Sequence, residues 1–86
     1  MAYEIKYRPA ALRELNKIPA DIRRRINSMI GMLSADPRPP GAAKMAGRDG
    51  FWRVRLGDYR VVYEIHDGNK VVRVFSVGHR SDIYRN

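Results

Sequence analysis

Two short turn signals in the second half of the chain constrain its fold more than any other feature. Gly57-Asp58 and Asp67-Gly68-Asn69 separate three stretches rich in β-branched and aromatic residues, at 52–56, 59–66 and 71–77. Turns this short allow only antiparallel pairing of consecutive strands, because a parallel neighbour requires a crossover of about a dozen residues or more. The sequence therefore predicts an antiparallel meander of three strands.

The first half of the chain has a different pattern. Residues 3–7 alternate between aromatic or aliphatic and charged side chains, which indicates a short half-buried strand. Helical spacing of apolar residues follows from Pro9 to Ile18, and after Pro19 a second apolar stripe runs to Leu33. Asp36-Pro37 ends this helix and opens a loop. We therefore expect a strand followed by a helical hairpin.

Together these elements predict an α+β fold. An N-terminal strand and a two-helix hairpin pack on a small, mostly antiparallel four-stranded sheet, and residues 1–86 form a single domain, because 86 residues cannot supply two cores. The helices cover one face of the sheet. Trp52, Val54 and Leu56 face that core, so Arg53 and Arg55 point to the opposite, open face.

The charge balance indicates what the open face meets. Lys and Arg number 17 against 9 Asp and Glu, a net charge of +8, and 13 of the basic residues are Arg. Guanidinium groups bind phosphate oxygens in pairs and stack on bases, so the expected partner is a polyanion.

Several classes of protein are excluded or disfavoured. With no cysteine and two histidines, the chain can form neither a disulfide nor a thiolate metal site, and we expect no metal or other cofactor. No apolar run approaches the roughly 20 residues of a membrane span, and the opening residues lack the apolar core of a signal peptide. We therefore expect a cytoplasmic protein with no membrane partner.

The candidate binding residues are basic, with one aromatic neighbour. Charge on the open face is also common in antiparallel sheets simply because it prevents edge pairing, so only the convergence of several arginines indicates a site. Trp52 and Tyr63 are interpreted as core residues. The convergent set comprises Arg53, Arg55, Arg60, Arg80 and Tyr84, with Lys44 and Arg48 in the preceding loop.

The end of the last strand leaves two geometries open. If residues 71–79 alternate strictly, Arg73, Phe75, Val77 and His79 share one face, and Arg80 lies on the other. A bulge or strand end at Gly78 would instead re-aim the chain. The sequence does not decide between them.

The order of elements and two local motifs resemble the RelE toxin family of the RelE/ParE superfamily of type II toxin–antitoxin systems. The motifs are GDYRVVYEI at 57–65 and VFSVGHRSDIYR at 74–85, and the resemblance spans essentially the whole chain. It implies a ribosome-dependent mRNA endonuclease, an mRNA interferase that needs no metal. In that chemistry a ribose 2′-hydroxyl attacks the adjacent phosphorus and leaves a cyclic phosphate.

The resemblance also implies residue roles. Arg53 and Arg55 match the two basic strand positions, Arg60 matches the phosphate-binding arginine and Arg80 the arginine after the last strand, while Tyr84 would stack on or orient the base. Active members commonly have lysine at the two strand positions. Because arginine stays protonated at any working pH, proton transfer would pass to His79 or Tyr84.

Partners follow from the resemblance as well. It implies an acidic, RelB-like cognate antitoxin, the ribosome with its mRNA, and binding of the toxin–antitoxin complex to its own operator DNA through the antitoxin. Two alternatives remain at this point. One is a ParE-like inhibitor of DNA gyrase that acts by binding, and the other is a non-catalytic nucleic-acid-binding module, which the charge alone would support.

Overall fold

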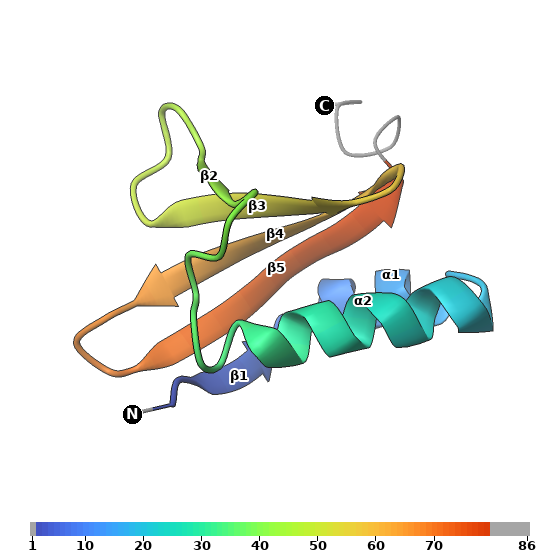
Figure 1. Ribbon diagram of the computed structural model, residues 1–86, viewed down its shortest axis with the longest axis horizontal. Coiled ribbons are helices and arrows are strands. Elements are labelled where there is room, and N and C mark those ends of the chain that lie inside the picture. Colours follow the sequence, from blue (N-terminus) through green and yellow to red (C-terminus); the bar gives the residue numbers. More distant parts are fainter. Residues whose placement is uncertain (1, 80–86) are drawn as a thin grey trace.

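The computed structural model describes residues 2–79, in which two helices pack on a mixed five-stranded sheet (Figure 1). The strand order is β1-β5-β4-β3-β2, with β1 parallel to β5 and every other pair antiparallel. The elements in chain order are β1 (Glu4–Tyr7), α1 (Pro9–Asn16), α2 (Ala20–Met32), β2 (Ala43–Lys44), β3 (Phe51–Leu56), β4 (Tyr59–His66) and β5 (Val71–His79). The α+β class and the antiparallel meander are thus confirmed.

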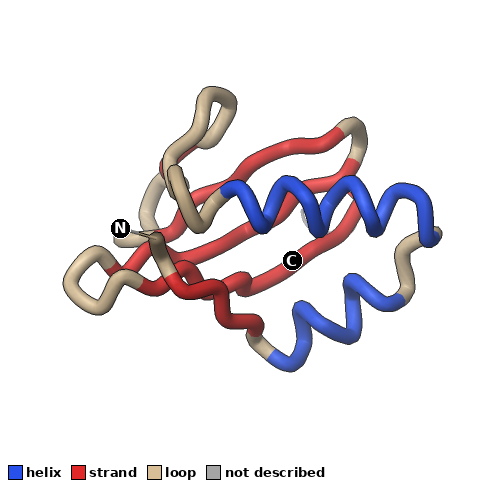
Figure 2. Tube along the Cα trace, turned by 60° about the horizontal axis from the view of Figure 1, so that its bottom comes forward, coloured by secondary structure: helices blue, strands red, loops and turns tan. Residues whose placement is uncertain are grey.

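Both helices lie on the same face of the sheet (Figure 2). Pro9 occupies the first turn of α1, where its missing N–H has no partner to lose, and Pro19 sits at the N-terminal boundary of α2. The core lies between the helices and this face, and contains Leu15, Ile26, Ile30, Leu33, Val54, Val61, Tyr63, Val72, Val74 and Val77 among others. Burial of this apolar area is the main force that holds the helices on the sheet. No helix in residues 2–79 is long and apolar enough to cross a membrane.

Helix α1 also completes the edge of β5. Strand β1 pairs with β5 only as far as Val74, so the outer edge of β5 continues beyond it. There the Glu14 carboxylate accepts hydrogen bonds from the Val77 backbone N–H at 2.9 Å and from the Ser76 hydroxyl at 3.1 Å. The Glu14 carboxylate therefore supplies the acceptor that a neighbouring strand would otherwise provide for the N–H of the buried Val77.

A bulge in β5 resolves the uncertain alternation. Val62 pairs with Ser76 but Tyr63 pairs with Val74, so Phe75 is an inserted residue. The insertion reverses the alternation, and Val77 therefore lies on the core face with Val74. Of the two geometries that the sequence left open, strict alternation is therefore excluded and a bulge is present. The bulge lies at Phe75 rather than at Gly78, and β5 extends to His79 rather than ending at 77.

The sheet has one strand more than the four predicted. Strand β2 contains only Ala43 and Lys44, paired with Arg53 and Trp52 of β3. Two residues are too few to produce a periodic pattern, so this segment was placed in a loop. The backbone N–H of Met45 donates to the carbonyl of Phe51 at 2.9 Å and extends the pairing by one bond.

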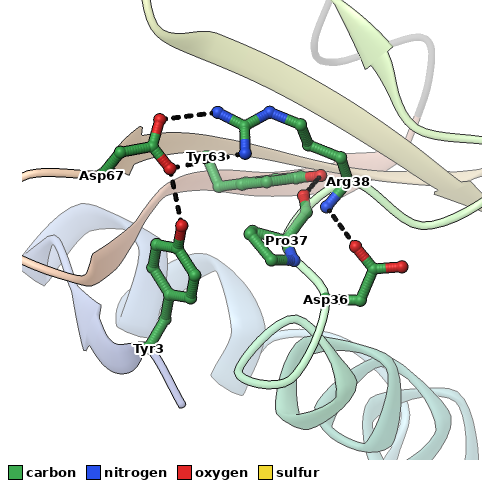
Figure 3. Close-up of polar contacts among 6 residues, drawn as sticks. All are labelled: Tyr3, Asp36, Pro37, Arg38, Tyr63 and Asp67. Atoms are coloured by element: carbon green, nitrogen blue, oxygen red, sulfur yellow. Dashed lines mark hydrogen bonds and ion pairs between the residues drawn. The ribbon is translucent and has the colours of Figure 1, made fainter. Parts of the chain in front are cut away.

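A polar clasp fixes the loop between α2 and β2 (Figure 3). Arg38 forms an ion pair with Asp67 in the β4–β5 turn at 2.8 Å, and the Tyr3 hydroxyl donates to the same carboxylate at 2.6 Å. Beneath them the buried Tyr63 hydroxyl donates to the carbonyl of Pro37 at 2.7 Å. Three distant segments of the chain are thereby tied together at the start of this loop.

Candidate nucleic-acid site on the open sheet face

Three of the predicted arginines meet on the open face of the sheet. Gly57 and Asp58 form a two-residue hairpin turn with a positive φ of 61° at Gly57, which suits the twist of the strands it joins. This turn sets Arg55 directly opposite Arg60, while Arg53 lies opposite Val62 on the same face. The three arginines line a hollow whose other walls are Pro40, Gly41, Ala43 and the backbone of Val54. We call it the arginine hollow.

The arginine hollow concentrates positive charge. Arg60 is only 8% exposed, Arg53 is half-buried and Arg55 is exposed. None of the described residues that line the hollow is acidic. Like charges directly opposite each other on a sheet repel, so the Arg55–Arg60 pair disfavours the pairing of β3 with β4 at this position. An anion bound in the hollow would remove that penalty, and a phosphate fits the planar donor groups.

The clasp positions one wall of this hollow. Pro40 and Gly41 follow Arg38 in the same loop, and Gly41 adopts a φ of 94° that strains any residue with a side chain. At the other side of the ion pair, the hydrogen bond from Arg38 and then that from Tyr3 hold the pKa of Asp67 below its usual value. The Asp67 carboxylate therefore stays charged to a lower pH than a free carboxylate, and its ion pair with Arg38 continues to hold the loop.

Lys44 and Arg48 do not join the arginine hollow. Lys44 pairs with Trp52, so it lies on the face opposite to Arg53. Arg48 lies farther along the open face, with its guanidinium 5.2 Å from the ring centre of Phe51. The two residues were predicted as one RNA-binding group, and the structure places them on different faces.

His79 is also separated from the three arginines. It pairs with Tyr59 on the helix-covered face, and the two rings meet edge to face with centres 5.5 Å apart. It lines two hollows on that side, one beside Glu14 of α1 and the other beside Arg25 of α2. Arg60 pairs instead with Gly78, one residue earlier. Arg80 and Tyr84 lie outside the described residues.

Some residues of this face were not singled out from the sequence. Pro40 and Gly41 were interpreted only as loop residues, and Phe75 only as part of an alternating strand. The two-residue turn was a usable signal, since it already dictates that Arg55 faces Arg60. Nothing in the local sequence indicated that Pro40 returns to the sheet. Within residues 2–79 no group of three histidine, aspartate or glutamate side chains could hold a metal ion.

Comparison with known proteins agrees with this architecture. The family model described as "ParE toxin of type II toxin-antitoxin system, parDE" matches residues 5–84. Toxin RelG of Mycobacterium tuberculosis is 34% identical over 86 residues, which cover 99% of both chains. The chain belongs to the RelE family of type II toxins. The mRNA interferase toxin RelE of Escherichia coli K12 is a further relative, 32% identical over 98% of this chain and 92% of its own length.

Solved structures of RelE-family complexes have the same fold. The toxin in the RelBE2 toxin–antitoxin complex of M. tuberculosis has a TM-score of 0.81 and 29% identity, over 93% of this chain and 100% of its own. The archaeal RelE–RelB complex from Pyrococcus horikoshii gives a TM-score of 0.82 and 27% identity over 100% of both chains. This RelE-like chain is therefore the toxin component of a type II toxin–antitoxin system. Because the individual relatives are RelE and RelG toxins, the gyrase-inhibitor alternative is not favoured.

Proposed function

We propose that this RelE-like toxin is an mRNA interferase that cleaves mRNA on the ribosome. The observation that carries the proposal is the arginine hollow, which three arginines from two neighbouring strands line together, one of them almost fully buried. The related E. coli protein named mRNA interferase toxin RelE supports the same reaction class.

The proposed reaction is an internal transfer at phosphorus. The ribose 2′-oxygen loses its proton and bonds to the adjacent phosphorus, the bond from phosphorus to the 5′-oxygen breaks, and the leaving oxygen takes up a proton. The products are a 2′,3′-cyclic phosphate and a free 5′-hydroxyl. No metal enters any step of this proposal. Charge that builds up on the phosphoryl oxygens is stabilised by Arg53, Arg55 and Arg60, which line the same hollow.

The proton transfers need a different group. Arginine keeps its proton at neutral pH, so the hollow supplies electrostatic stabilisation and no general base. His79 and Tyr84 are our candidates for proton transfer, with Arg80 as a fourth phosphate ligand. His79 lies on the face of the sheet opposite to Arg60, so it would reach the scissile phosphate only around the end of β5. Arg48, on the open face, would contact RNA outside the scissile phosphate, whereas Lys44, on the opposite face, would contact only RNA that passes around the edge of the sheet.

The natural inhibitor is proposed to be an acidic, RelB-like antitoxin. The related toxins of M. tuberculosis and P. horikoshii are known in complexes described as RelBE2 and RelE–RelB. A net charge of +8 suits an acidic segment that folds as it binds. The complex would bind its own operator DNA through the antitoxin.

The test uses purified toxin, programmed ribosomes and a defined mRNA, with cleavage mapped by primer extension. We expect cuts at A-site codons that require ribosomes, a cyclic phosphate end, and strong loss of cleavage in Arg60→Gln. Arg24→Gln is the matched control, because Arg24 is an exposed arginine on α2. An Arg60→Gln variant that folds and cuts at the wild-type rate would refute the site, and intact mRNA with wild-type toxin would refute the function.

A further inference from the structure

A second group of residues on the open face has no part in the reaction described above. Phe51 and Phe75 contact each other edge to face, with ring centres 5.2 Å apart. The Arg8 guanidinium lies 4.2 Å from the Phe75 ring centre, and that of Arg48 lies 5.2 Å from the Phe51 ring centre and 5.8 Å from that of Phe75. We call these four residues the aromatic cluster.

The aromatic cluster lies in line with the arginine hollow. Phe51 and Arg55 are on the same strand and the same face, four residues and therefore about 13 Å apart. Arg53 lies midway between them. Cationic groups thus recur along the face, with Arg53 two residues from Arg55 on β3 and the Arg48 guanidinium beside Phe51, two residues farther along the strand.

The two rings do not belong to the core. Both are half-buried, and the cluster of buried side chains beneath the helices contains neither of them. Phe75 is the residue that the β5 bulge inserts, and the bulge brings its ring next to Phe51 on the polar side of the sheet. The sheet therefore holds apolar ring surface on the face that carries its phosphate ligands.

We propose that the aromatic cluster is a second RNA subsite, in which one nucleobase of the substrate strand stacks on the Phe51–Phe75 pair. This inference rests on the proposed function and extends it along the strand, away from the scissile phosphate. Aromatic faces stack on any base, and arginines beside them bind the phosphates on either side. The exposed Arg48 side chain lies above both rings and can move to a phosphate as a base takes its place.

The charges around the cluster favour RNA over an acidic peptide. The single carboxylate in the row of described residues that contains Phe51 is Glu64, which is ion-paired with Arg73 at 3.3 Å and hydrogen-bonded to the ring of His66 at 3.1 Å. Arg8, Arg48 and Arg73 thus surround the cluster, and the one carboxylate in its row is already paired with Arg73. A peptide carboxylate would use the arginines alone, whereas stacked bases use both the rings and the arginines.

The experiment measures binding of a short single-stranded RNA with 2′-O-methyl riboses, which cannot supply the nucleophile. A 2-aminopurine base is placed at successive positions, because its fluorescence is quenched when it stacks. In the full-length toxin we expect quenching at one position that Phe75→Leu abolishes, together with an affinity loss of about 5- to 150-fold. Leucine keeps apolar volume at the bulge but has no ring. In Arg48→Gln the slope of log affinity against log salt concentration should decrease by the contribution of about one phosphate contact.

Ribosomal cleavage separates this inference from the proposed function. Phe75→Leu and Phe51→Leu should raise KM with a smaller effect on kcat, whereas Arg60→Gln should lower kcat. If both leucine variants bind RNA and quench 2-aminopurine as the wild type does, the subsite is refuted while the function stands. If they weaken only the binding of an acidic antitoxin peptide, the cluster is a protein site and our inference is wrong. If Arg60→Gln cleaves normally, the proposed function fails instead.

Discussion

Replacing Arg55 by glutamine should make the toxin more stable and less active. Arg55 and Arg60 are directly opposite on β3 and β4, and none of the described residues lining the hollow between them is acidic. Two unit charges 4 Å apart repel by about 1 kcal/mol in bulk water. Favourable directly opposed pairs on a sheet contribute about 0.2–1 kcal/mol, and we take the repulsion of a like-charged pair to be of similar size. Because Arg55 is exposed, we expect the variant to gain about 0.5 kcal/mol, which raises Tm by roughly 2–4 °C.

The same substitution removes one group that stabilises charge on the phosphoryl oxygens. Loss of one such donor typically lowers kcat by about 10²- to 10³-fold. Thermal unfolding at low and high salt and ribosomal cleavage measure the two effects on one preparation, with Arg24→Gln as control. The gain in Tm should shrink at high salt, since exposed charges are screened. A variant that is less stable than the wild type at low salt, or that keeps full activity, would contradict our account of the hollow.

Further predictions at three positions, Tyr63, Asp67 and Glu14, concern the scaffold around the site. Tyr63→Phe leaves the carbonyl of Pro37 without its donor, so urea unfolding should show a loss of about 1–3 kcal/mol. Burial raises the pKa of the Tyr63 hydroxyl to about 12, and this effect is larger than the lowering caused by the charge of Arg38. The stability of the wild type should therefore fall as the pH rises from about 10 to 12, and Tyr63→Phe should not show this fall. The pKa of Asp67 is lowered in the folded protein, so ionised Asp67 stabilises the fold above the unfolded pKa of 3.8, and this stabilisation is lost as the pH falls below that value. In an acid titration, the free energy of unfolding of Asp67→Asn should therefore fall less steeply than that of the wild type. Glu14→Ala should cost about 1–3 kcal/mol in urea unfolding because it leaves the Val77 N–H unpaired, whereas Glu14→Gln, which keeps an acceptor, should cost less; equal losses would refute the role of the carboxylate oxygen.

The meander and the helical hairpin could be predicted because their signals are local. The turn at Gly57-Asp58 fixes both the direction and the register of its hairpin, so Arg55 and Arg60 were placed on the open face correctly. The apolar stripe that ends at Leu33 likewise identified the helix that covers the core. Charge and residue type then indicated an anion as the ligand.

What the sequence could not predict depends on contacts between distant segments. The bulge at Phe75 arises from the pairing of β5 with β4, and no turn-forming residue in the local sequence indicates it. Its effect is large, because the reversed alternation sends Val77 and His79 to the helix side and Phe75 to the open face. The two residues of β2 form a strand only because β3 offers them an edge, and Pro40 reaches the hollow through the same pairing.

One further prediction concerns how the arginine hollow acts in the reaction, and a substitution of Arg55 tests it. Because arginine keeps its proton and its charge at any working pH, the wild-type hollow adds no pH dependence to cleavage in the usual assay range. Arg55→Lys introduces an amine whose pKa is near 10.4 in water and is lowered by the positive charges of Arg53 and Arg60. If the hollow acts only by electrostatic stabilisation, the cleavage rate of this variant should decline at high pH, relative to wild type, as the amine loses its charge. A pH–rate profile measured in single-turnover cleavage tests this, with Arg24→Lys as control. A rate that instead increases as the amine becomes neutral would show that position 55 can act as a general base, and our division of roles between the arginines and a separate proton-transfer group would be wrong.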